Sequence, residues 1–158
     1  MNIWTYTKEL VPSDPINVLF RRILLVDIFA FLRSNGWGSA APLARTQYLL
    51  NPDIYNMLPQ NEQLSFTPNL RVPARRLHIR LWNINGEVLG AIHIETWEPR
   101  KNIFDHTLLD FDAAKITFAG LCRNNAIWKV VPSGVPLNNR FAGHSLPFHD
   151  GYALLVQG

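Results

Sequence analysis

Histidine, arginine and glutamate recur at alternate positions in the segment 76–95. His78 and Arg80 are separated by one residue, and His93 and Glu95 have the same spacing. Residues two apart in a strand share one face, so each pair would present its side chains together. Such a surface could bind an anion, share a proton, or ligate a metal through two histidines and a third group. It could also be an ordinary solvent-facing side of an antiparallel sheet.

These side chains meet only if the chain folds back between them, and the sequence predicts such a hairpin. Asn85-Gly86 separates two alternating segments, and Asn-Gly is a favoured two-residue hairpin turn. Pairing of Ile84 with Glu87 then sets the register. One face carries polar residues: His78 opposite His93, Arg76 opposite Glu95, and Arg80. The other face carries apolar residues that would lie on the core: Leu77, Ile79, Leu81, Ile92 and Ile94. A one-residue slip would mix the two sets, so we expect this register and an open polar groove.

A second group of polar side chains follows the hairpin. His106, Asp110 and Asp112 place one imidazole and two carboxylates close together in the sequence. They could hold a divalent cation or act as acid and base. A simpler interpretation makes Asp112 the N-cap of a helix over 113–124 and Asp110 the end of a strand.

A third group lies near the C-terminus. His144 and His149 have a spacing that is a weak metal signal, and Asp150 follows directly. Asp150-Gly151 is also a common turn sequence. We therefore interpret this segment as a turn that leads into a strand.

The elements that must position these residues follow from apolar periodicity. The chain has 158 residues and 18.1 kDa, the size of one domain, so we expect a single domain over 1–158. Apolar residues with helical spacing predict a helix over 22–34. Strands are expected over these segments: 16–20, 76–84, 87–97, 104–110, 127–131 and 152–156. An irregular loop is expected over 132–150. Together these elements predict an α+β fold, a mixed, mostly antiparallel sheet with two principal helices on one face.

Composition narrows the classes of partner. Fifteen Lys and Arg against twelve Asp and Glu give a net charge of +3, a weak signal for nucleic-acid binding. The single cysteine, Cys122, excludes an internal disulfide. No apolar stretch reaches the ~20 residues of a spanning helix, and residues 1–14 lack the apolar run of a leader. We therefore expect a cytoplasmic protein without a transmembrane segment.

Motifs along most of the chain resemble the LssY-like C-terminal domain family. They are SDPINVLF (13–20), NGW (35–37), RLHIRLW (76–82), HTLLDFDAAK (106–115) and FHDGYALLV (148–156). The sequence departs from the family at Leu77, where a first histidine is usual, and at Ala114-Lys115, where Glu-Arg is usual. The family domain often follows membrane segments, and its own role is not established. The resemblance implies that five residues form one site: His78, Arg80, His106, Asp110 and Asp112.

Three hypotheses for function follow. The first is a binding or accessory module for a small phosphate-like anion, with Arg76 and Arg80 holding the anion and His78 and His93 donating hydrogen bonds. The second is a hydrolase, with or without a metal, that uses His78, His106 and Asp110. The third is a structural or self-associating module that forms a homo-oligomer through exposed aromatic residues. Neither a cofactor nor a resident metal is assigned by the sequence.

Overall fold

The structure is a computed structural model, and it describes most but not all of the chain. The described residues are 4–6, 12–39, 49–53, 56–59, 62–66, 75–98, 103–137, 139 and 149–158. Among them are two helices, α1 (Leu25–Ser34) and α2 (Asp112–Cys122). The strands are β1 (Trp4–Tyr6), β2 (Pro12–Pro15), β3 (Val18–Arg21), β4 (Gly38–Ser39), β5 (Leu49–Asp53), β6 (Asn56–Pro59), β7 (Glu62–Phe66), β8 (Arg75–Ile84), β9 (Glu87–Glu98), β10 (Ile103–Asp110), β11 (Lys129–Pro136) and β12 (Tyr152–Gln157).

The strands form a large sheet and a small one. The large sheet has the order β11-β12-β3-β9-β8-β7-β4, and β10 also pairs with β9. Its pairings are antiparallel except for that of β12 with β3. The small sheet has the order β2-β1-β5-β6. The predicted α+β fold with a mixed, mostly antiparallel sheet is confirmed.

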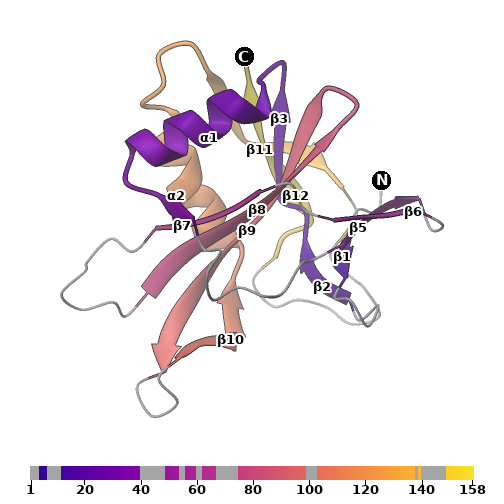
Figure 1. The fold of residues 1–158 in the computed structure, drawn as a ribbon, viewed down its shortest axis with the longest axis vertical. Coiled ribbons are helices and arrows are strands. Elements are labelled where there is room, and N and C mark those ends of the chain that lie inside the picture. Colours follow the sequence, from indigo (N-terminus) through magenta and orange to yellow (C-terminus); the bar gives the residue numbers. More distant parts are fainter. Residues whose placement is uncertain are drawn as a thin grey trace.

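Both helices lie on one face of the large sheet, as predicted. Ile28 and Leu32 of α1 share a core with Phe118 and Cys122 of α2 and with apolar residues of β3, β8, β9 and β12. Figure 1 shows the two helices on one side of the fold and the small sheet on the other. No helix in the described part of the chain is long and apolar enough to cross a membrane.

The opposite face of the large sheet is buried as well. It carries its own apolar cluster of Ile16, Leu19, Trp82, Leu89, Ala91, Leu137, Ala153 and Leu155. In addition, β2 of the small sheet contacts β9. Because the sheet is covered on both sides, polar residues on this second face must find their partners inside the protein.

The hairpin of β8 and β9 has the predicted register. Ile84 lies opposite Glu87, and the pairing continues without a shift to Arg75 opposite Thr96. Asn85 and Gly86 have φ angles of 49° and 82°, the left-handed conformations that a tight hairpin turn requires. The prediction from alternation and turn chemistry is confirmed.

Several predicted boundaries differ from the observed ones by one or two residues, and two differ by more. The first helix begins at Leu25 and not at residue 22, because Arg22 has a φ of 59° and turns the chain between β3 and α1. Residues 132–136 continue β11 instead of starting a loop. The β11–β12 register shifts between Val131 and Val135, so an irregularity in the pairing accommodates the proline and glycine of this segment.

Asn17 completes the sheet at a gap beside β9. One edge of β9 pairs first with β3 and then with β10, and Ile92 lies between these two pairings. Asn17 Nδ2 donates to the Ile92 carbonyl at 2.9 Å, and the Ile92 N–H donates to Asn17 Oδ1 at 2.9 Å. The side-chain amide thus takes the place of a strand residue and fixes β9 next to His93.

We predict that Asn17→Ala destabilises the fold by about 1–3 kcal/mol, because it leaves the buried N–H and C=O of Ile92 without these partners. Urea denaturation followed by circular dichroism measures the change. Asn124→Ala, at an exposed position after α2, is the matched control and should leave the free energy of unfolding nearly unchanged. Equal stabilities for the two variants would contradict the role given to Asn17.

Candidate functional site

The polar face of the hairpin is buried, and the prediction of an open groove was wrong. His78, Arg80, His93 and Glu95 are between 0% and 3% exposed. The interpretation of this face as solvent-facing is wrong for the same reason. Asp14 of β2, itself 3% exposed, reaches this face from the small sheet and contacts His93.

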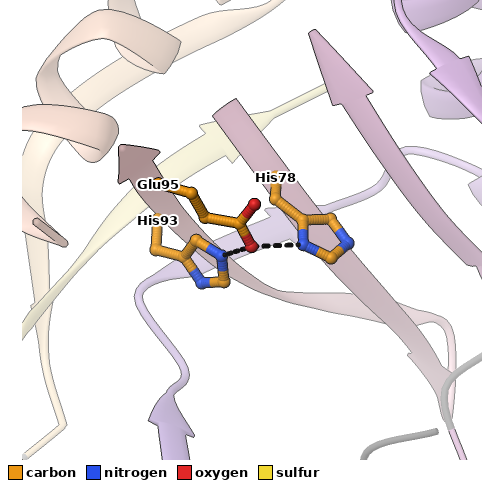
Figure 2. A group of neighbouring side chains, drawn as sticks. All are labelled: His78, His93 and Glu95. Atoms are coloured by element: carbon orange, nitrogen blue, oxygen red, sulfur yellow. Dashed lines mark hydrogen bonds and ion pairs between the residues drawn. The ribbon is translucent and has the colours of Figure 1, made fainter. Parts of the chain in front are cut away.

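Two histidines share one oxygen of Glu95 at the centre of this cluster. Glu95 Oε1 lies 2.7 Å from His93 Nε2 and 3.2 Å from His78 Nδ1. Figure 2 shows the two imidazoles pointing at the carboxylate from neighbouring strands, β8 and β9. The other oxygen, Glu95 Oε2, accepts a hydrogen bond from Arg76 Nε. Each oxygen of this buried carboxylate therefore has a nitrogen partner.

A second carboxylate supports His93 from the opposite side. His93 Nδ1 lies 2.6 Å from Asp14 Oδ2, so both ring nitrogens of His93 face carboxylate oxygens. Arg80 Nη1 lies 3.7 Å from the same Asp14 oxygen. We refer to His78, His93, Glu95, Asp14, Arg76 and Arg80 as the His–Glu cluster.

The two imidazoles differ in charge. Burial opposes a charge on His93, but Asp14 and Glu95 outweigh it and raise the pKa of His93 to about 9. Burial lowers the pKa of His78 to about 4, with the charges of Arg80 and His93 acting in the same direction against a hydrogen bond to Glu95. At neutral pH His93 is thus cationic and His78 is neutral.

The two carboxylates remain ionised despite their burial. Burial alone would raise the pKa of Asp14 and Glu95, but the neighbouring histidines lower both pKa values below their ordinary range. Because an ionised carboxylate only accepts hydrogen bonds, the proton of neutral His78 lies on Nδ1. The lone pair of that ring then lies on Nε2.

Asp110 and Asp112 have contacts outside the His–Glu cluster. Asp110 Oδ1 accepts a hydrogen bond from the Ala113 N–H at 2.8 Å, so Asp110 caps α2 and the prediction of Asp112 as its N-cap was wrong. The reason is that α2 begins at Asp112 itself. Asp112 Oδ1 instead accepts a hydrogen bond from the Asp150 N–H. The contacts described for these two aspartates thus do not join them to His78 or Arg80.

His106 belongs to β10, but its side chain lies outside the described part of the structure. The grouping of His106 with His78 in one site therefore stays a prediction. His144 also lies outside the described residues. His149 is buried and bonds through Nε2 to Asn139 Oδ1 at 2.8 Å.

A second polar cluster joins the start of α2 to the start of β12. Lys115 is 3% exposed, and its Nζ donates to Asp150 Oδ1 at 2.7 Å and to the Tyr152 carbonyl at 3.0 Å. Asp112 lies 3.5 Å from the same ammonium group. Asp112, His149 and Asp150 are close enough to share a metal ion, but Lys115 already brings a cation to both carboxylates. Gly151 has a φ of 84°, so the predicted Asp-Gly turn is confirmed.

Sequence reasoning missed one member of the His–Glu cluster, Asp14. It placed Glu95 on the polar face opposite Arg76 but did not assign it to the set of ligand-binding residues. A usable signal existed for Asp14, since it lies in the segment 13–20 that carries one of the family-like motifs.

We predict that the free energy of unfolding is greatest near pH 6.5 when the protein has been treated with a chelator to remove metal ions. The folded pKa of His78 lies below the unfolded value of 6.5, so stability is lost as pH falls from 6.5 towards 4. The folded pKa of His93 lies above 6.5, so its stabilisation is present below 6.5 and is lost as pH rises towards 9. Urea denaturation across this range measures the profile. In the variant His93→Gln, the loss of stability above pH 6.5 should disappear. A free energy of unfolding that keeps rising above pH 6.5 in the unsubstituted protein would refute the raised pKa of His93.

Lys115→Met is expected to lower the free energy of unfolding by about 1–2 kcal/mol. It keeps most of the buried side-chain volume but removes the donor to Tyr152 and the cation between two half-exposed carboxylates. Thermal denaturation tests this, with the exposed Lys129→Met as control. A melting temperature equal to that of the control would show that the Lys115 cluster adds no stability.

Comparison with known proteins gives no relative: no family model, curated protein or solved structure matches the chain. The resemblance to the LssY-like C-terminal domain therefore rests on the quoted motifs and stays a prediction. The site is defined by its own geometry, a buried histidine pair on one carboxylate.

Proposed function

We propose that this domain is a binding module for a divalent transition metal ion, held by His78, His93 and Glu95. The observation that carries the proposal is the meeting of three donor atoms. One nitrogen of each histidine and one oxygen of Glu95 lie within 4.8 Å of one another. Of the three uses considered for the polar face, an anion, a shared proton or a metal, this geometry supports the metal best.

The donor set suits such an ion. Imidazole nitrogen and carboxylate oxygen are its ordinary ligands in proteins, and two histidines with one glutamate form a known zinc-binding set. Tetrahedral ligands about 2.0–2.1 Å from an ion lie about 3.3 Å apart. The His78–Glu95 distance is 3.2 Å and the His93–Glu95 distance is 2.7 Å. The His78–Glu95 pair thus already has this spacing, and the His93–Glu95 pair would have to open by about 0.6 Å to accommodate the ion.

The surroundings of the ligands also support the proposal. Metal-bound histidines usually donate their other ring N–H to a carboxylate or carbonyl, which fixes the ring. Asp14 occupies that position for His93, and Arg76 binds the glutamate oxygen directed away from the histidines. The ion would displace the proton from His93 Nε2 and shift that of His78 to Nε2.

Burial favours a bare ion over a larger ligand at the centre of the cluster. The ligand residues are 0–1% exposed, and two ionised carboxylates would repel an anion placed between the histidines. The phosphate-like ligand expected from the sequence therefore has no place there without a metal. Three protein ligands leave one coordination position open, the arrangement of catalytic zinc sites, so metal-assisted hydrolysis is the second candidate function.

The test is a titration of the full, chelator-treated chain with Zn²⁺ by calorimetry and with Co²⁺ by visible absorption. We expect one ion per chain with a dissociation constant of about 1 µM or lower. Glu95→Gln should abolish binding. Asp14→Asn, which weakens only the support of His93, should reduce affinity roughly 10–100-fold.

His149→Gln is the matched control, because it alters a buried histidine outside the cluster. It should bind the metal as the unsubstituted chain does. Circular dichroism of each variant separates loss of binding from loss of fold. A folded, unsubstituted chain that binds neither ion overturns the proposal.

A further inference from the structure

Asp14 supports the proposed metal site from a strand with few main-chain hydrogen-bond donors. It belongs to β2, whose sequence is PSDP. Proline has no N–H, so only the two middle residues of this strand can donate from the main chain. In the described part of the structure, β2 lies at the edge of the small sheet and pairs with β1 alone. The position of Asp14 therefore depends on more than the regular pairing of β2.

The pairing of β1 with β2 is irregular at Asp14. Trp4 of β1 lies opposite Pro15, but the next paired residue of β1, two positions on, lies opposite Pro12. Two residues of β2 therefore face Thr5 alone, which is the arrangement of a β-bulge. Bulges redirect side chains and are over-represented beside active sites. This bulge lies where the side chain of Asp14 extends from the small sheet to the large one.

The side chain of Thr5 restrains this bulge. Its hydroxyl group, Oγ1, donates to the Asp14 carbonyl at 2.6 Å. Thr5 and Asp14 are both buried, so water does not compete for this hydrogen bond. Because the bond ends on the main chain of Asp14, it fixes the point from which the carboxylate reaches its partners.

The contacts continue from Asp14 to a proposed ligand of the metal. Asp14 Oδ2 lies 2.6 Å from His93 Nδ1. A carboxylate on the outer nitrogen of a metal-bound histidine orients the ring, and its loss lowers the affinity for the ion. It can orient the ring only if it is itself held to within about 0.5 Å. The hydroxyl group of Thr5 meets this requirement through the main chain of Asp14.

We infer that Thr5 is a positioning residue of the metal site, and that the pairing of β1 with β2 controls the affinity for the ion. The inference rests on the proposed function and names how the small sheet regulates that site. Thr5 supplies no ligand atom and acts through Asp14. Any change that loosens β1 from β2 lowers the affinity of the histidines and glutamate in the large sheet.

The experiment compares threonine variants of the full, chelator-treated chain by calorimetry with Zn²⁺ and by visible absorption with Co²⁺. Thr5→Val keeps the branched shape of the side chain and removes the hydroxyl group. Its affinity for Zn²⁺ should fall about 3–10-fold, which is less than for Asp14→Asn because the carboxylate remains. Thr5→Ser keeps the hydroxyl group and should bind nearly as tightly as the unsubstituted chain.

A double variant distinguishes positioning from a general loss of stability. If Thr5 acts through Asp14, then Thr5→Val should leave the affinity of Asp14→Asn nearly unchanged. A purely structural effect would lower the affinity by the same factor with and without Asp14→Asn. Thr117→Val is the matched control, because Thr117 also donates to a main-chain carbonyl, that of Ala113, but on the exposed side of α2. It should bind both ions as the unsubstituted chain does.

The outcomes separate this inference from the proposed function. Failure of the folded, unsubstituted chain to bind either ion overturns both. Normal binding with equal affinities in Thr5→Val and Thr117→Val overturns the role of Thr5 alone. An equal loss of affinity with and without Asp14→Asn, or a loss in Thr5→Ser as large as in Thr5→Val, also overturns it. Thr5→Ala removes the same hydroxyl group and replaces Thr5→Val if circular dichroism shows that this variant is unfolded.

Discussion

The architecture depends on the compensation of two buried carboxylates, Asp14 and Glu95, by one histidine between them. Glu95 comes from the large sheet and Asp14 from the small one, and His93 contacts both within 2.7 Å. A buried carboxylate without partners would cost several kcal/mol. The docking of β2 over the large sheet and the ionisation of Asp14 are therefore coupled, because the partners of Asp14, His93 and Arg80, belong to the large sheet.

The same arrangement gives the two histidines different pKa values, because their neighbours differ. His93 lies between two negative charges, whereas His78 contacts one shared oxygen and also senses Arg80. Opposite shifts of neighbouring titratable groups are frequent at functional sites, although structural ion networks produce them too. The position of His93, unlike its pKa, does not depend on the charges around it alone. Asn17 fixes the backbone of Ile92, which holds the adjacent His93 in place independently of its charge.

The local parts of this structure could be predicted from the sequence, and the long-range parts could not. The register of β8 and β9 follows from a two-residue alternation and an Asn-Gly turn, so the facing of His78 and His93 was predictable. Their burial was not, because the covering residue Asp14 lies 79 positions from His93. Asn17 is 75 positions from Ile92. A strand with a polar residue at every second position has the same sequence pattern whether water or a second sheet covers its polar face.

The need to pack the two sheets together does not by itself explain why histidines, arginines and carboxylates occupy these buried positions. Well-packed apolar side chains of similar volume hold layers together at least as well as a buried ion network, and often better. Among the contacts described here, His78 shares its acceptor oxygen on Glu95 with His93. Its position makes chemical sense when the shared oxygen and both imidazoles bind one ion. The donors then no longer compete for a single acceptor.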